Sequence, residues 1–317
     1  MTSKLHVALV ATLALVACES ATSMPATSPI AKPAETSGLS AGRSEQTVMV
    51  GGRERNYLLF LPDNYKAARN LPIVFAFHGG GDNANNMADW SSLPELARRE
   101  GFVLVIPNGT YNKRNNGGTW NTDTPWVQGS AERLNVDDVA FFDAMLERTA
   151  RQVSINRNRV FATGMSKGGM MSYHLACHRA ETLRAIAPVA ATMTTQTCDP
   201  SGKVEILHLH GSSDETVPLN GGRGTMTMSR KADYRSVSST LTFWANEASC
   251  SAATKASDRG TEYSCSSYCS SVSYCVFDGG HTWPGMPPAK WQERFNVKTP
   301  QSFDASEYIW SYFDDLR

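Results

Sequence analysis

The sequence predicts an α/β fold in which a mostly parallel β-sheet is covered by helices on both faces. Short, almost wholly apolar runs alternate along the chain with longer runs in which apolar residues recur at helical spacing. Strands that are covered on both faces must be apolar throughout, as these runs are. The 317 residues are 41% hydrophobic and 19% charged, a composition typical of a globular protein with a substantial core.

The expected elements alternate between strand and helix. Strands are predicted at residues 56–61, 71–77, 102–106, 159–163, 185–189, 205–209 and 272–277, and helices at 93–100, 138–154, 168–180 and 306–313. Parallel strands need crossover connections, which the intervening helices supply. Active sites in such sheets lie at the carboxyl ends of the strands, so the loops that follow the strands are where functional residues are expected.

The N-terminal segment predicts export. Lys4 precedes an apolar run at residues 7–16, the order found in secretory signal peptides, and the run is shorter than the roughly 20 residues that cross a bilayer. It ends in Leu15-Val16-Ala17-Cys18, which resembles a bacterial lipobox. We therefore expect a lipoprotein signal peptide over residues 1–17 and a lipid on Cys18. An ordinary signal peptide cleaved a few residues later is the alternative.

The lipid on Cys18 would anchor the protein in the cell envelope, in the periplasm or at the outer membrane and outside the cell. Residues 18–45 are mainly Ala, Ser, Thr and Pro and predict a disordered tether, which leaves residues 46–317 as a single folded domain. Lys plus Arg and Asp plus Glu both number 30, so no basic excess is available for a phosphate backbone or an anionic membrane. Nucleic acid is not an expected partner, and the sequence does not indicate an oligomeric state.

The cysteines fit an oxidising compartment. With Cys18 assigned to the lipid, an even number remains for disulfides: Cys177, Cys198, Cys250, Cys265, Cys269 and Cys275. We expect Cys177 to pair with Cys198 and the last four to pair among themselves in an order that the sequence does not fix. Zinc held by the closely spaced cysteines is the alternative, but Ser, Tyr and Val dominate the segment around them and the nearest histidine, His281, has another predicted role.

A Gly-x-Ser-x-Gly motif, Gly164-Met165-Ser166-Lys167-Gly168, stands between a predicted strand and a predicted helix. A sharp strand-to-helix turn crowds its neighbours, so glycines on both sides of the serine are a steric requirement. The turn exposes the hydroxyl at the helix N-terminus, whose positive end favours developing negative charge. Ser166 is the predicted nucleophile, and a plain glycine-rich turn is the alternative.

A nucleophilic serine needs a general base, and the base needs a carboxylate to orient it. Where the serine lies on such a turn, the carboxylate and then the histidine follow it along the chain. Asp214 lies in the loop after the strand at 205–209, with Glu215 as the alternative acid, and His281 is the only histidine downstream. The sequence therefore predicts a triad of Ser166, His281 and Asp214.

Two backbone N–H groups are needed to stabilise an oxyanion, one of them from the residue after the nucleophile. Lys167 supplies the first, and Gly80, with Gly79 as the alternative, is expected to supply the second from the loop after the strand at 71–77. A phosphate-binding loop is not predicted, because no Lys-Ser or Lys-Thr pair follows these glycines and their spacing is not Gly-x-Gly-x-x-Gly.

No metal or cofactor is predicted. His174 and His178 have the i, i+4 spacing of two zinc ligands, but Leu175 stands where a zinc protease has its glutamate. We expect this pair, and likewise His208 and His210, to be packed or solvated rather than catalytic.

These motifs together resemble the secreted esterases grouped as polyhydroxybutyrate depolymerase-like proteins, with feruloyl and acetylxylan esterases. The resemblance extends over nearly all of the chain from residue 46 and rests on the segments at 160–173, 186–190, 210–214 and 279–285. It implies an α/β-hydrolase fold, the same Ser166, Asp214 and His281 triad, and no cofactor. Val136-Asp137-Asp138-Val139 resembles the family segment in which an Asp caps a helix. Lys167 departs from the small polar residue often found after the serine, which leaves donation by its backbone N–H intact.

The function expected from the residues and the resemblance is hydrolysis of a carboxylic ester through an acyl-enzyme, with feruloyl or acetyl groups on plant polysaccharide as the first choice. Depolymerisation of a polyhydroxyalkanoate or another polyester is the alternative. A catalytically inert, membrane-tethered carbohydrate-binding protein is the alternative of another class, and it would lack a triad residue or the oxyanion glycines. Trp120 and Trp126, in a Gly- and Asn-rich segment at 108–135, and Trp283, beside the base, are the expected substrate contacts.

Overall fold

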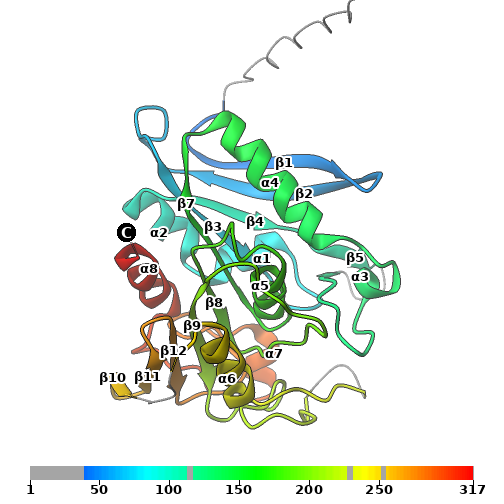
Figure 1. Cartoon of the computed structure of the whole chain (residues 1–317), viewed down its shortest axis with the longest axis vertical. Helices are drawn as coiled ribbons and strands as arrows, with labels where there is room; N and C mark the ends of the chain where they lie inside the picture. Colours follow the sequence, from blue (N-terminus) through cyan, green and yellow to red (C-terminus); the bar gives the residue numbers. More distant parts are fainter. Residues whose placement is uncertain (1–38, 113–116, 227–230, 251–254, 317) are drawn as a thin grey trace, which may run out of the picture. The chain divides into compact units, whose positions relative to one another are not determined.

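A ten-stranded sheet forms the centre of the protein in the computed structural model (Figure 1). The structure describes residues 39–112, 117–226, 231–250 and 255–316. The expected signal peptide, Cys18 and most of the expected tether therefore lie outside the described residues. The first strand of the described residues begins at Gly42, before the domain boundary expected at residue 46. No helix in the described ranges is long and apolar enough to cross a membrane.

The sheet has the order β1-β2-β4-β3-β7-β8-β9-β12-β11-β10. Neighbouring strands from β4 to β12 in this order are parallel, whereas the pairs at the two ends of the sheet are antiparallel. The strands are β1 (Gly42–Val50), β2 (Arg53–Leu61), β3 (Leu71–Phe77), β4 (Val103–Pro107), β7 (Ile155–Met165), β8 (Ala185–Val189), β9 (Glu205–Gly211), β10 (Lys255–Arg259), β11 (Tyr263–Cys269) and β12 (Val272–Phe277). The predicted fold class is confirmed.

Each face of the sheet carries its own apolar core. Along β3, Ile73 and Phe75 lie in a cluster with side chains of α4, α5 and α6, whereas Val74 and Ala76 lie in a second cluster with side chains of α1, α2 and α8. Alternate residues of a strand point to opposite faces, so this burial on both sides explains why the strand is apolar at every position. The helices are α1 (Ala84–Trp90), α2 (Leu93–Glu100), α4 (Asp138–Gln152), α5 (Lys167–His178), α6 (Val237–Glu247) and α8 (Ala305–Asp315).

Several short elements that the sequence did not predict lie near the carboxyl ends of the strands. They are the hairpin of β5 (Thr110–Asn112) and β6 (Gly117–Thr119) and the short helices α3 (Ser130–Arg133) and α7 (Lys290–Arg294). Helices α1 and α6 and the strands β1, β10 and β11 were not predicted either. The hairpin of β5 and β6 and the helix α3 fall within the Gly- and Asn-rich segment at 108–135, so this segment is partly regular structure.

Three disulfides connect the six cysteines outside the N-terminal segment. Cys177 bonds to Cys198, Cys250 to Cys269, and Cys265 to Cys275. The first joins the end of α5 to the segment after β8, and the third links paired positions of β11 and β12. The expected pairing is confirmed, and these sulfurs are not available as zinc ligands.

Candidate active site

Ser166 lies on a sharp turn between β7 and α5. Its φ of 56° and ψ of −120° place it in a strained left-handed conformation at the N-cap of the helix, and the backbone N–H of Ser166 donates to Val189 at 2.9 Å. A Cβ on Gly164 or Gly168 would collide with the carbonyl of Phe77. Both glycines of the motif are thus required by the close passage of β3, which confirms the steric argument made from the sequence.

The predicted base and acid are in direct contact. His281 Nδ1 lies 2.8 Å from Asp214 Oδ2, and both side chains are buried. The other carboxylate oxygen accepts the backbone N–H groups of Thr216 and Val217, each at 2.8 Å. Burial alone would raise the pKa of Asp214, but the neighbouring imidazole and these hydrogen bonds hold that pKa below its ordinary value. Glu215, the alternative acid, points to solvent.

The contact between Asp214 and His281 determines which imidazole nitrogen can act as a base. An ionised carboxylate only accepts hydrogen bonds, so Nδ1 carries a proton, and in the neutral imidazole the free lone pair is then on Nε2. Ser166 and His281 both follow parallel strands of one sheet, β7 and β12, and so stand at the same edge. Within the described part of the chain they are not hydrogen-bonded to each other. Such contacts are often long before substrate binds.

The loop after β3 lies against the serine turn. A Cβ on Gly79 would stand 3.8 Å from Ser166 Cβ, and a Cβ on Gly80 would stand 3.5 Å from Lys167 Cβ. The two expected oxyanion donors, the N–H groups of Gly80 and Lys167, therefore belong to adjoining segments beside the nucleophile. The N–H of Lys167 is in the first turn of α5, where backbone donors have no partner within the helix.

His78 orients the peptide that carries the Gly80 donor. Its Nε2 accepts the backbone N–H of Gly109 at 2.9 Å, so the proton must be on Nδ1, which donates to the carbonyl of Gly79 at 2.7 Å. The carbonyl of Gly79 and the N–H of Gly80 belong to the same peptide unit. Because the C=O and N–H of a trans peptide point in opposite directions, the Gly80 N–H points away from the imidazole. Burial lowers the pKa of His78, so the ring stays neutral and keeps this arrangement.

Residues 65–240, which include Ser166 and Asp214, match the family described as phospholipase/carboxylesterase. The chain belongs to this family. A probable feruloyl esterase C from Aspergillus oryzae is 32% identical over 58% of this chain and 65% of its own length. Feruloyl esterase C from Emericella nidulans is 33% identical over 55% of this chain and 59% of the relative, and feruloyl esterase D from Neurospora crassa is 30% identical over 61% and 67%.

Among solved structures, an acetyl xylan esterase from Aspergillus awamori aligns with a TM-score of 0.57 and 18% identity, over 80% of this chain and 98% of that one. At this identity the likeness concerns the fold alone. The α/β-hydrolase fold expected from the sequence is confirmed. The match to the first curated relative spans about two thirds of that relative's length.

Trp120 is not a substrate contact in this esterase-family structure. The side chain is fully buried, packs edge-to-face on Phe77 and donates its indole N–H to the carbonyl of His78 at 2.8 Å. Two residues before it, Gly118 in β6 accepts from Gly81 at 2.8 Å and donates to the carbonyl of Asp82 at 2.7 Å. The segment that contains Trp120 thus holds the loop after β3, and the expected contact with substrate is wrong because the indole faces inward.

Trp283 and Trp126 are also buried. Trp283 is 2% exposed, donates to Ser306 at 3.0 Å and packs edge-to-face on Trp90, so it joins the loop of His281 to α8 instead of facing substrate. Trp126 is 8% exposed and packs edge-to-face on Tyr234 in a small apolar cluster at the carboxyl edge of the sheet. The expectation that these indoles present a face to substrate is wrong, because each packs against the protein.

The side chain of Lys167 forms a buried ion pair that the sequence did not predict. Its Nζ lies 2.7 Å from Glu132 in α3 and donates to Thr122 at 2.9 Å, and the two charged side chains are 3% and 7% exposed. The other oxygen of Glu132 accepts the N–H of Gly129. Burial lowers the pKa of Lys167, and the carboxylate opposes this shift. The residue after the nucleophile is thus tied to the segment at 120–135.

The segment at 136–139 opens α4 as the resemblance implied. Asp137 is the N-cap, and its carboxylate accepts the N–H of Ala140 at 2.8 Å. Asp138 is buried and bonds to Arg55 at 2.8 Å and to the N–H of Asn121 at 2.7 Å. It therefore also anchors the start of the segment that reaches Lys167.

The remaining internal histidines have structural partners. Tyr173 donates to His208, which donates to His210, which donates to the carbonyl of Val217 beside Asp214. Burial lowers the pKa of both histidines, so this chain of hydrogen bonds is built from neutral rings. It supports the loop that carries Asp214.

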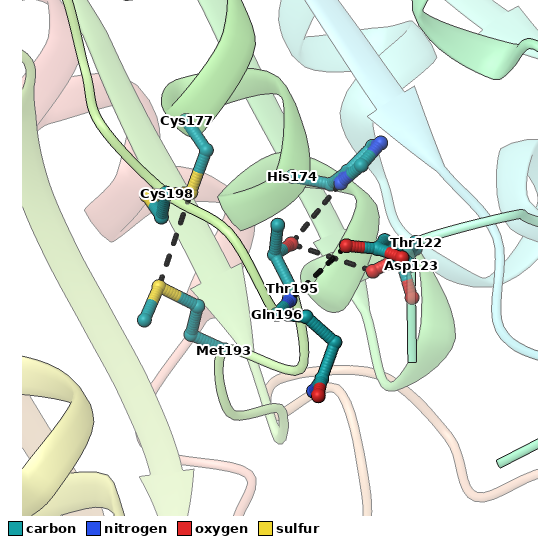
Figure 2. Close-up of a disulfide and its surroundings, with 8 residues drawn as sticks. All are labelled: Thr122, Asp123, His174, Cys177, Met193, Thr195, Gln196 and Cys198. Atoms are coloured by element: carbon teal, nitrogen blue, oxygen red, sulfur yellow. Dashed lines mark hydrogen bonds between the residues drawn. A yellow bond between two sulfur atoms is a disulfide. The ribbon is translucent and has the colours of Figure 1, made fainter. Parts of the chain in front are cut away.

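His174 lies near the disulfide between Cys177 and Cys198 and pairs with Thr195 at 3.1 Å, as Figure 2 shows. His174 lines a polar cavity of about 220 Å³ together with Asn121 and residues 135–138. Burial lowers its pKa to about 3. Among the described residues no group of three or more potential ligands could hold a metal ion, and His174 and His178 form an edge-to-face ring pair instead.

One exposed aromatic residue beside the base was missed. Trp291 in α7 is 40% exposed, and its ring centre lies 6.3 Å from that of His281. The residue stands ten positions after the histidine, in a short helix without clear periodicity, and its sequence gave no signal of this placement.

Proposed function

We propose that the protein is a serine esterase that removes feruloyl or acetyl groups from plant polysaccharide. The observation that carries the proposal is the buried bond between His281 and Asp214 at the sheet edge where the strained Ser166 turn meets the oxyanion loop. Relatives named feruloyl esterase support the acyl group.

In the proposed reaction, His281 Nε2 takes the proton of Ser166 as the serine oxygen attacks the ester carbonyl. The N–H groups of Gly80 and Lys167 stabilise the oxyanion of the tetrahedral intermediate. When this intermediate collapses, the bond to the alcohol oxygen breaks and the imidazolium returns the proton to that oxygen. Asp214 stays ionised and stabilises the imidazolium. Water, activated by the same imidazole, then attacks the acyl-enzyme and releases the carboxylic acid and free Ser166.

The test is a substrate panel on the wild type and on Ser166→Ala. The wild type should hydrolyse methyl ferulate or acetylated xylan, and the variant should lose at least about 10³-fold in turnover with an unchanged melting temperature. If the wild type hydrolyses only 3-hydroxybutyrate oligomers, the substrate is a polyester and not an ester of a polysaccharide. Near-normal hydrolysis by Ser166→Ala would remove the proposed nucleophile, and an inert wild type that binds xylan would make the protein a binding protein.

We further propose that the protein is exported and carries a lipid on Cys18. Three disulfides fit an oxidising compartment outside the cytosol. Mass spectrometry of the N-terminal peptide from expressed full-length protein should find a diacylglyceryl group on Cys18, and Cys18→Ser should move the esterase from the membrane fraction to the soluble one. An unmodified mature N-terminus further along the chain would favour an ordinary signal peptide.

A further inference from the structure

The exposed indole of Trp291 stands beside the proposed general base on a helix that is fixed to it. Its neighbour Gln292 is buried, and its side-chain amide donates to the backbone carbonyl of His281 at 2.9 Å and accepts from the N–H of Ala289 at 2.6 Å. The backbone carbonyl of Gln292 in turn accepts from Val297 at 2.8 Å. The position of Trp291 relative to the imidazole is therefore set by buried polar contacts.

Trp291 differs from every other tryptophan of the chain. All seven lie within the described residues, and it is the only one that is exposed, whereas five are between 0% and 8% exposed and Trp90 is half-buried. Aromatic side chains are common in ligand-binding sites, where a bound molecule covers their apolar faces. An indole left in water within 6.3 Å of the His281 ring is thus placed to be covered by whatever binds at this side of the site.

The chemistry proposed above identifies which part of the ester lies there. Nδ1 of His281 is occupied by Asp214, so Nε2 must deliver the proton to the departing alcohol oxygen. The alcohol part of the ester therefore lies on the imidazole side, and the acyl carbonyl oxygen lies on the side of Gly80 and Lys167. In an ester of a polysaccharide, the group nearest to Trp291 is the sugar ring.

We infer that Trp291 is the platform on which the sugar ring of the substrate stacks. One face of a pyranose or furanose ring carries mainly C–H groups, and a flat indole offers them a large apolar area at little conformational cost. Phe295, which is 57% exposed, is the C-cap residue directly after α7, and its backbone N–H donates to the carbonyl of Trp291 at 3.1 Å, so a second exposed aromatic residue adjoins the indole along the chain. This inference rests on the proposed function and specifies the alcohol part of the ester substrate.

The kinetic test compares two esters of the same acid. Trp291→Ala should raise KM for a feruloylated arabinoxylan oligosaccharide about tenfold, leave kcat for that substrate within twofold, and leave kcat/KM for methyl ferulate within twofold. Trp291→Phe should recover most of the loss. Met49→Ala, which removes an exposed apolar side chain from β1, is the matched control and should change neither ester. p-Nitrophenyl esters are unsuitable, because their aromatic leaving group would itself reach the indole.

Equal effects of Trp291→Ala on both esters, or no effect on either, would overturn the inference. A second measurement tests the sugar platform separately from the catalytic proposal. Calorimetry measures the binding of xylotetraose, which carries no ester, to Ser166→Ala and to the double variant Ser166→Ala, Trp291→Ala. The dissociation constant should rise about tenfold in the double variant. Unchanged binding removes the platform even if the enzyme is an esterase, whereas weakened binding in a protein that hydrolyses neither ester keeps the platform and removes the esterase.

Discussion

Replacing Glu132 by alanine would leave the ammonium of Lys167 buried without its carboxylate, one residue after the proposed nucleophile. Removing one partner of a buried ion pair costs about 3–5 kcal/mol. The buried amine can instead release its proton, which at pH 7 costs about 4.6 kcal/mol from an ordinary pKa near 10.4, at about 1.36 kcal/mol per unit. This second route limits the loss, so we expect the free energy of unfolding of Glu132→Ala to fall by about 3–4.6 kcal/mol.

For a protein of this size a loss of that order lowers the melting temperature by roughly 6–10 °C, which calorimetry measures directly. The pH dependence identifies the cause. If the folded variant holds Lys167 neutral, its unfolded chain binds one more proton, so the stability of the variant rises with pH relative to the wild type. The difference between the two proteins should therefore narrow between pH 7 and pH 10.

The same substitution should lower turnover, because the backbone N–H of Lys167 is a proposed oxyanion donor. Complete loss of one donor costs about 10²–10³-fold in kcat, and a displaced donor should cost about tenfold, measured with methyl ferulate. Glu147→Ala is the matched control, since Glu147 pairs with Arg157 on the surface, where both side chains are about half exposed, and such pairs are worth less than about 1 kcal/mol. If Glu132→Ala were as stable and as active as this control, the buried pair would have no role at the site.

Two further outcomes are expected. Burial lowers the pKa of His174 to about 3. Between pH 6.5 and pH 3 the unfolded chain therefore takes up a proton that the folded chain does not, and stability falls as the pH drops through this range. In urea titrations from pH 6.5 to 4.5, His174→Asn should reduce the dependence of the unfolding free energy on pH by about 1.4 kcal/mol per pH unit; an unchanged pH dependence would contradict this. Trp120→Phe replaces the buried indole by a smaller ring and removes its hydrogen bond to the carbonyl of His78. The substitution should cost at least about 1 kcal/mol of stability and lower kcat several-fold at constant KM; unaltered kcat would show that this contact is not needed.

Strands that are specified by residues within the strand itself were predicted closely. The runs 71–77, 185–189 and 272–277 match β3, β8 and β12 to the residue, because apolar residues dominate each run and a polar residue, Asn70, Arg184 or Ser271, directly precedes it. The run 159–163 underestimates β7 (Ile155–Met165), since residues 155–159 are half-buried or exposed and lack the apolar signal. The Ser166 turn was predictable for a similar reason, as steric limits on a turn act within a few residues.

The environments of the tryptophans could not be predicted, because they depend on contacts far apart in sequence. Trp283 stands two residues after His281, yet it packs on α8 through Ser306, whereas Trp291, ten residues away, is the indole that α7 brings to the imidazole. Proximity along the chain indicated a role beside the base but not which side chain would fill it. The ion pair of Lys167 with Glu132, 35 positions apart, left no pattern for the same reason.

These nonlocal contacts concentrate in one stretch. Within residues 108–135, Gly109 and Trp120 hold His78, which precedes the proposed donor Gly80, while Thr122 and Glu132 hold Lys167, the other proposed donor. A segment that the sequence suggested as a substrate loop is thus attached to the segments of both proposed oxyanion donors. Changes in this segment should therefore alter kcat, because Trp120 and Glu132 hold the two chain segments that carry the proposed oxyanion donors.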